Sequence, residues 1–369
     1  MKRIIKFWCY PLFLMGILTV ATSSCKKSDD ASDRNYYKGS ASRGDLVTFE
    51  INKTDKSYSI NNETTGNTES GIYSIMDGQL SGVYKVTTGA NNFYAVELDD
   101  QVIAANFPSG NSENKLTFGI SSSINNVGKE AQIAGDYIYI HFSNTAVNGN
   151  VRNKEWGIVS VLQSGTLYIK PYATGGTPGI SGLTTLAPEN FNLTLPLSTG
   201  DLQGSWSVNG NDKVKLNVGI NGTQYTGFSY TSSTSAVFML DMGVGNGYIL
   251  GLKIPATPVN ISQLAGTYKY VGVVSDGKKL AGNAIIKTDG TGTCAIESNG
   301  ILSDNEYFTG ITQCPHLSNV LYANHFDPDF PTYQGKAYFV LMGDIMMYFI
   351  FDNQGLFNAY GAGAKITVP

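Results

Sequence analysis

The amino-acid sequence predicts an all-β protein made of two antiparallel β-sandwich or β-barrel domains. Glycine is abundant, at 42 of 369 residues, against about 7% in average proteins. Segments rich in Val, Thr, Tyr and Phe alternate with short runs of Gly, Asn and Asp, which favour tight turns. No apolar stripe with helical spacing persists for the roughly 10 residues that a helix needs. Short strands separated by turns are typical of antiparallel sandwiches and barrels.

The first predicted domain spans residues 44–188. Apolar residues there alternate with polar ones, as at Val47, Phe49 and Ile51, and a turn leads into a second alternating run. This pattern predicts a hairpin. We predict further strands at residues 71–75, 82–87, 93–98, 102–107, 115–120, 136–142, 157–162 and 166–172.

The second predicted domain spans residues 189–369 and follows a connector rich in Gly, Pro and Thr at 173–188. Near its end, residues 337–342 and 345–351 are continuously apolar on either side of Gly343. Strands without polar alternation are covered on both faces. We therefore expect central strands joined by a tight turn at Gly343.

Three short segments of the first half are echoed, in the same order, in the second half. Either a diverged duplication or independent reuse of common strand motifs explains the echoes. The echoed pairs are 44–46 with 200–202, 93–108 with 237–255, and 133–137 with 264–268.

The N-terminus reads as a signal peptide over residues 1–24. A basic start is followed by an apolar run at 7–21, which is shorter than the roughly 20 residues of a membrane span. Small residues then lead into Cys25, with Thr22 at the position where most such signals have an aliphatic residue. This arrangement resembles the lipobox of bacterial lipoproteins of the Bacteroidota type.

The lipoprotein resemblance implies that Cys25 is acylated with palmitate-type chains and anchors the protein in the outer membrane. The polar leader at 26–30 is similar to a surface-export signal, so the cell surface is the expected location, with the periplasmic face as the alternative. We predict a flexible tether over residues 25–43. An ordinary secreted protein with a coincidental cysteine is the competing interpretation.

Charge and motifs exclude several classes of function. Removal of residues 1–24 takes away three positive charges, so the formal net charge falls from −4 to −7. Such a chain has no electrostatic attraction for nucleic acid. The sequence also lacks the motifs of α/β hydrolases, zinc proteases, nucleotide-binding loops and complete EF-hands. We predict no cofactor, no metal and no catalytic set.

Two cysteines, Cys294 and Cys314, remain after the signal peptide and Cys25 are set aside. In an oxidising compartment we expect them to form one disulfide, which would close a loop of about 20 residues. A metal site is the alternative, but His316 and His325 lack the ligand spacing that zinc sites show.

The candidate ligand-binding residues are aromatic and lie on two predicted strands. Alternation places Tyr137, Tyr139 and His141 on one face of the first strand, and Tyr168 and Tyr172 on one face of the second. Together these faces would make an exposed platform whose rings stack on sugars. Tyrosine also covers the wet face of ordinary sheets, so the platform remains one of two interpretations.

The function that best fits these observations is non-catalytic capture of glycans by a cell-envelope lipoprotein. A lipocalin-like barrel that carries an apolar ligand is the alternative, suggested by Met342, Met346 and Met347 on apolar strands. A polysaccharide-active enzyme is the third reading. It rests on His325 and its tyrosine and carboxylate neighbours.

Overall fold

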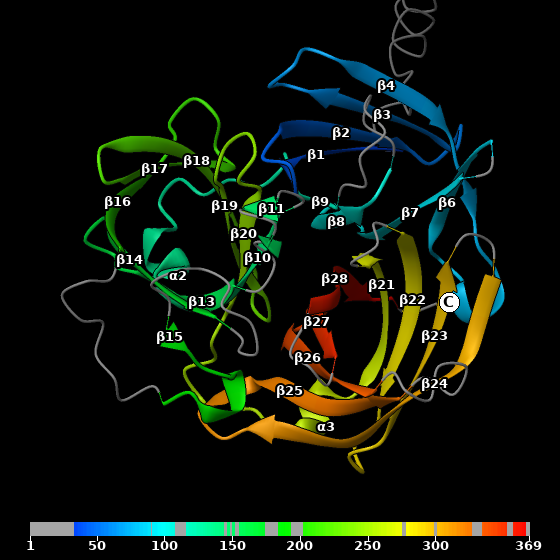
Figure 1. Cartoon of the computed structure of the whole chain (residues 1–369). Coiled ribbons are helices and arrows are strands. Elements are labelled where there is room, and N and C mark those ends of the chain that lie inside the picture. The colour runs from blue at the N-terminus through cyan, green and yellow to red at the C-terminus, as the bar shows by residue number, and fades with distance from the viewer. Residues whose placement is uncertain are drawn as a thin grey trace, which may run out of the picture. The chain divides into compact units, whose positions relative to one another are not determined.

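The computed structural model describes most of the chain after the N-terminal segment (Figure 1). The described residues are 33–89, 91–107, 116–143, 146–147, 150–151, 155–173, 184–192, 202–274, 278–298, 301–326, 334–352 and 357–366. Among them, no helix has the length and apolar character needed to cross a membrane. The predicted signal peptide and Cys25 lie outside the described residues.

The predicted all-β class is confirmed, and the strands gather into three large assemblies, antiparallel except for the β14–β15 pair, that follow one another along the described chain. The first assembly, here the first sheet, has the strand order β4-β3-β2-β1-β9-β8-β7-β6-β5. Its strands are β1 (Arg34–Ala41), β2 (Leu46–Asn52), β3 (Ser57–Asn62), β4 (Thr68–Ile72), β5 (Ser74–Ile75), β6 (Tyr84–Thr88), β7 (Asn91–Leu98), β8 (Val102–Ala105) and β9 (Thr117–Ser121), with a short 3-10 helix η2 (Gly78–Leu80).

The first sheet has the connectivity of a barrel that is open along one seam. Its first and last strands, β1 and β9, pair with each other, as they would in a closed barrel. Its two edges, β4 and β5, are consecutive in the chain and are separated only by Tyr73. One face carries an apolar cluster formed within this sheet, which includes Phe49 and Tyr58.

The predicted tether extended to residue 43, but its last part forms strand β1 instead. The side chain of Tyr37 is fully buried in the cluster of the first sheet. Gly39 lies opposite Gly119, where the two backbones approach so closely that an added Cβ would collide with the carbonyl oxygen of Phe118. The segment from Arg34 is therefore part of the folded sheet.

The second assembly, here the second barrel, forms a ring because β13 pairs with both β10 and β14. The predicted domain boundary at 188/189 falls between two of its strands, β15 and β16. The elements are α2 (Glu130–Ile133), β10 (Gly135–Phe142), β13 (Glu155–Val161), β14 (Thr166–Ala173), β15 (Thr184–Thr185), η4 (Pro188–Asn190), β16 (Leu202–Val208), β17 (Lys215–Ile220), β18 (Thr223–Thr231), β19 (Ala236–Asp241) and β20 (Tyr248–Lys253). A separate pair comprises β11 (Ala146–Val147) and β12 (Asn150–Val151).

The third assembly, here the third barrel, is a closed meander of β21 to β28. The predicted hairpin at Gly343 is present, with a φ of 59° at the glycine, and its strands are buried on both faces as expected. The elements are α3 (Ile261–Leu264), β21 (Gly266–Val274), β22 (Lys279–Ile286), β23 (Gly292–Ser298), β24 (Ile301–Cys314), β25 (Leu317–Phe326), β26 (Gln334–Met342), β27 (Ile345–Asp352) and β28 (Phe357–Lys365).

The second and third barrels begin with the same local arrangement. A short helix precedes the first strand, and a tyrosine of that strand donates its hydroxyl proton to the last helical carbonyl. A lysine from the last strand donates to the next carbonyl and lies over the tyrosine ring. This match supports a duplicated barrel unit. The residues are Ile133, Ala134, Tyr137 and Lys253 in the second barrel and Leu264, Ala265, Tyr268 and Lys365 in the third.

A large apolar cluster joins all three assemblies. It includes Val96 of the first sheet, Leu250 of the second barrel and Val271 of the third, each of them buried. The second and third barrels also have interior clusters of their own. Many strands are therefore covered on both faces, which decides where the predicted site residues lie.

Candidate functional site

The aromatic residues predicted on β10 are inside the second barrel. Tyr137 and Tyr139 are fully buried in its interior cluster, and His141 is 4% exposed. The predicted exposed face is therefore wrong for these residues. The alternation was read correctly, but β10 is apolar on its other face as well, and that face packs against the rest of the molecule.

The residues predicted on β14 lie on the opposite face of the sheet. Tyr139 is opposite Gly157 of β13, whereas Tyr172 is opposite its neighbour Trp156. Tyr172 is buried, with its ring 5.0 Å from that of Trp156, and Tyr168 is half-buried. The five residues consequently cannot form one platform.

The structure brings Tyr139 and His141 together with Glu155, which the sequence analysis missed. The Tyr139 hydroxyl donates to the Glu155 carboxylate at 2.8 Å. His141 Nδ1 lies 3.4 Å from that carboxylate, and Nε2 lies 2.6 Å from the Asn246 carbonyl oxygen. Burial, reinforced by Glu155, holds the pKa of Tyr139 well above its usual value, so the phenol stays protonated. These contacts fasten β10 to β13 and to the β19–β20 turn.

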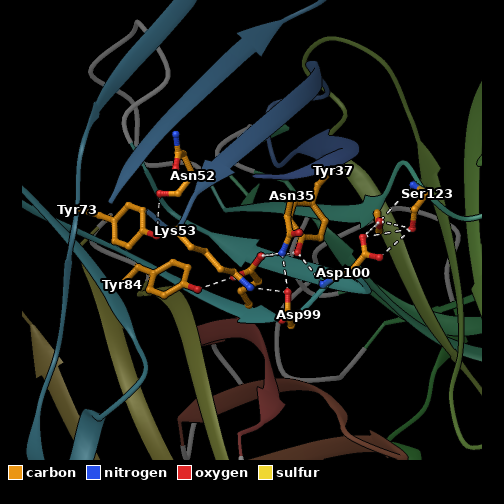
Figure 2. Close-up of polar contacts among 11 residues, drawn as sticks. Asn35, Tyr37, Asn52, Lys53, Tyr73, Tyr84, Asp99, Asp100 and Ser123 are labelled. Carbon is orange, nitrogen blue, oxygen red and sulfur yellow. Dashed lines mark hydrogen bonds and ion pairs between the residues drawn. The ribbon is translucent and has the colours of Figure 1, made fainter. Parts of the chain in front are cut away.

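The first sheet contains a larger polar network, centred on Glu97 of β7. Figure 2 shows its partners Asn35, Tyr37, Lys53 and Tyr84. The Glu97 side chain is 2% exposed. One carboxylate oxygen accepts hydrogen bonds from the Tyr37 hydroxyl and, at 2.7 Å, from Asn35 Nδ2. The other accepts from the Tyr84 hydroxyl and lies 3.6 Å from Lys53 Nζ. The buried carboxylate is thus satisfied by several donors, as burial requires.

The same network reaches solvent at Asp99, whose side chain is 73% exposed. Asn35 Nδ2 donates to Asp99 Oδ1 at 2.6 Å, and Lys53 forms an ion pair with the same oxygen. The hydrogen bond from Lys53 holds the pKa of Asp99 below its usual value, although partial burial opposes this shift. Asp99 is therefore a fixed anionic acceptor. We call Asn35, Tyr37, Lys53, Tyr84, Glu97 and Asp99 the Glu97 cluster.

The tyrosines of the Glu97 cluster are hydrogen-bond donors and not bases. Burial, and then the charge of Glu97, raise the pKa of Tyr37 and of Tyr84 far above the ordinary value. The Tyr84 ring also stacks on Tyr73, with a centroid distance of 4.5 Å (Figure 2). Sequence reasoning missed Glu97 because a charged residue in an alternating strand is normally read as solvent-facing.

A pocket of about 330 Å³ lies beside β4 on the outer face of the first sheet. Its position follows from alternation, because Glu50, Ser59 and Ser70 are cross-strand neighbours opposite the apolar face. Its volume falls in the range of small-ligand pockets. The lining residues are Glu50, Ser57, Tyr58, Ser59, Ser70 and Gly71.

Cys294 and Cys314 do not form the predicted disulfide. The residue opposite Cys294 on β24 is Glu306, eight positions before Cys314, so the two cysteines are about 25 Å apart along the strand. A disulfide requires Cα atoms within about 7 Å. Burial raises the pKa of Cys314 to about 12, which keeps it as an unreactive thiol.

The histidines of the third barrel are not gathered into a catalytic or metal site. His316 is exposed in a turn, whereas His325 is buried with its ring 5.5 Å from Phe308. Within the described residues, no group of three potential metal ligands occurs. Asp327, the predicted carboxylate neighbour of His325, lies outside the described residues.

Buried side chains of the third barrel form an apolar cluster of their own. Met346 belongs to this interior cluster, whereas Met347 and Met342 face the cluster shared with the other assemblies. Leu321, Phe339 and Tyr348 also occupy the interior. In the described part of the barrel, core packing thus accounts for the methionines that suggested an apolar carrier.

Comparison with known proteins finds distant structural likenesses. No protein family matches the chain, and no curated protein matches it. A protein of unknown function from the DUF3598 family of Nostoc punctiforme is 10% identical, with a TM-score of 0.19, over 64% of this chain and 97% of its own. Transferrin binding protein B of Haemophilus parasuis is 10% identical, with a TM-score of 0.26, over 92% of this chain and 77% of its own.

The isotype 1 transferrin binding protein B of serogroup B Neisseria meningitidis is similar at the same level. It is 12% identical, with a TM-score of 0.26, over 90% of this chain and 77% of its own. Likenesses this distant do not assign the chain to a family.

Proposed function

We propose that the protein is a non-catalytic binding protein of the cell envelope, and that the Glu97 cluster binds a glycan. The observation that carries this proposal is the placement of Asp99. Both bonds to it fall on Oδ1, so within the described chain Oδ2 has no partner and can accept a sugar hydroxyl. Buried Glu97 and its tyrosines hold Asn35 in place, which reduces the entropy lost on binding.

Binding fits the Glu97 cluster better than catalysis does. A general base or nucleophile needs a pKa near the working pH, whereas the pKa values of Tyr37 and Tyr84 are raised far above it. Lys53 is paired with the carboxylate of Asp99. Each of these groups is therefore fixed as a donor or an acceptor.

Asp99→Asn should weaken glycan binding about tenfold and leave the stability unchanged, because it replaces a charged acceptor on an exposed side chain. Binding is measured on a glycan array and then by calorimetry with the best hit. Asp289→Asn is the matched control, since Asp289 is an exposed turn aspartate of the third barrel. Equal affinity of wild type and Asp99→Asn would refute the assignment.

The pH dependence of glycan binding tests the role of Asp99 independently. A depressed pKa means that the Asp99 carboxylate stays ionised as the pH falls through the ordinary aspartate range. Glycan binding should therefore persist at mildly acidic pH and disappear only in stronger acid. Loss of binding near pH 6 would point to another group.

The proposed location in the cell envelope depends on acylation of Cys25. Cys25→Ala should therefore abolish lipid labelling. The lipobox-like residues before Cys25 support acylation, and the acyl chains would then anchor the protein. The measurement is metabolic labelling with a palmitate analogue, followed by fractionation of the membranes. Cys314→Ala is the control, because that thiol is buried. Equal labelling of wild type and Cys25→Ala would exclude the anchor.

A further inference from the structure

The turn between β1 and β2 packs closely against the turn between β19 and β20. An added Cβ at Gly44 would collide with the carbonyl oxygen of Gly243, so only glycine allows the two turns to approach this closely. The Gly245 amide donates to the Arg43 carbonyl oxygen at 2.7 Å across the contact. The two turns therefore connect the first sheet to the second barrel through their backbones.

A buried carboxylate lies in the same contact. Asp241, at the end of β19, is 7% exposed, and its Oδ1 accepts a hydrogen bond at 2.6 Å from the Ser40 hydroxyl of β1. Among the described residues, no cation pairs with this carboxylate. Burial of an ionised carboxylate without a cation is costly. We call residues 40–45 and 241–247 the joint.

The β1–β2 turn brings two charged residues to the joint. Asp45 is 3% exposed, and its negative charge opposes ionisation of Asp241. Arg43 is half-buried. The charge that acts on Asp241 from this turn is that of Asp45 and not that of Arg43. The turn therefore adds to the cost of a charged Asp241.

The strands packed around the joint do not supply a cation for Asp241 either. Lys38 of β1 is paired with Asp212 of the second barrel at 2.6 Å. Tyr248, opposite Asp241 on β20, keeps its proton because burial holds its pKa well above the usual value. His141 of β10 points into the second barrel, where its Nε2 lies 2.6 Å from the Asn246 carbonyl oxygen.

The protonation of Asp241 is therefore coupled to closure of the joint. Burial raises the pKa of Asp241 to about 6, and the charge of Asp45 adds to this rise, although hydrogen bonds from Ser40 and the Gly243 amide oppose it. If the joint opened, the exposed carboxyl would titrate near the ordinary value of about 3.9. The closed joint thus holds a proton that the open joint releases between these two pH values. Closure is most favoured below about pH 4, and this advantage is lost as the pH rises to about 6.

We propose that the joint is a pH-sensitive contact, which holds the two turns together in acid and lets them separate more often once the Asp241 carboxylate is ionised. Geometry supports this proposal, because a carboxylate without a described cation lies buried where the two assemblies meet. This inference goes beyond glycan binding and uses residues outside the Glu97 cluster.

The test is hydrogen exchange of the detergent-solubilised full-length protein, measured by mass spectrometry on peptides that cover the joint. The pH is varied from about 4 to about 8, and the intrinsic exchange rates are corrected for pH. We expect the opening equilibrium of the joint to rise by up to ~100-fold between about pH 4 and about pH 6 and to level off above that. Peptides from the β26–β27 hairpin should show no such rise.

Asp241→Asn keeps an acceptor for the Ser40 hydroxyl but cannot ionise, so its joint should exchange equally slowly at every pH. Ser40→Ala removes a hydrogen bond that favours the ionised form, so exchange should level off at a higher pH than in the wild type. Asp212→Asn is the matched control. It removes a half-buried carboxylate between the same two assemblies and should keep the dependence on pH.

Two results would overturn the proposal: exchange of the wild-type joint that does not depend on pH, or an equal rise in the wild type and in a folded Asp241→Asn variant. If Asp241→Asn misfolds, Ser40→Ala still decides the question, because an unchanged pH dependence in that variant would assign the rise to another group. Glycan binding by Asp99→Asn is measured separately, and its result does not affect this inference.

Discussion

Glu97→Ala is expected to lower the free energy of unfolding by about 3 kcal/mol, because it leaves the Tyr37 and Tyr84 hydroxyl groups without their acceptor. Both tyrosines donate to the Glu97 carboxylate, and the Tyr37 side chain is fully buried whereas that of Tyr84 is half-buried. Glu97→Gln should cost less, since the amide oxygen still accepts one hydroxyl. Urea unfolding followed by circular dichroism measures both changes.

The control for Glu97 is Glu130→Ala, which removes a carboxylate from the surface of helix α2 and should change the stability by no more than about 0.5 kcal/mol. If Glu97→Ala were as mild as this control, the cluster would not be a satisfied buried network. The proposed ligand site would then lack the rigid support that the glycan assignment requires.

Gly39→Ala should be at least as damaging, with an expected loss of about 3 kcal/mol, because it forces the β1 backbone away from β9. The added Cβ would collide with the Phe118 carbonyl oxygen, which belongs to the backbone and cannot rotate away. Gly210→Ala is the matched control, since an added Cβ there meets no atom within 4 Å. Thermal unfolding of both variants measures the difference. If Gly39→Ala left the thermal stability unchanged, residues 34–41 would not be part of the folded sheet, and the predicted tether would stand.

The positions of strands and turns could be predicted from the sequence because they depend on local chemistry. The turn between β7 and β8 contains Asp99 and Asp100 and lies between the predicted strands at 93–98 and 102–107, with a φ of 51° at Asp100. The hairpin turn between β19 and β20 carries three left-handed glycines, Gly243, Gly245 and Gly247, as expected for a glycine-rich turn. Period-two alternation and turn residues act within a few positions, so one sequence is enough to read them.

The buried face of each strand could not be predicted, because burial depends on what covers the sheet from outside. Tyr139 and Ile140 are both buried although they point in opposite directions. One faces the interior of the second barrel and the other faces the cluster shared by the three assemblies. Alternation reports two faces and does not say which of them meets water.

The candidate site and the cysteines required knowledge of register across distant strands. Glu97 of β7 meets Tyr37 of β1 only because β7 pairs with β8, β8 with β9, and β9 with β1, a contact across 60 positions of the chain. Cys294 and Cys314 are near each other in sequence, yet the length of β24 separates them. Residues far apart in the sequence can therefore be in contact, as Glu97 and Tyr37 are, and residues close in the sequence can be far apart, as Cys294 and Cys314 are.

The pairing of first and last strands bears on how the chain folds. Tyr137 of β10 pairs with Lys253 of β20, and Tyr268 of β21 pairs with Lys365 of β28, so each ring closes through contacts of very long sequence separation. Closing each ring costs chain entropy before the stabilising contacts of the last strand have formed. Folding rates accordingly fall as contact order rises. Neighbouring hairpins can form as the chain emerges, but each ring waits for its final strand. We therefore expect closure of these two seams to be the slow step of folding, during which the open edges of the meanders are exposed to pairing with other chains.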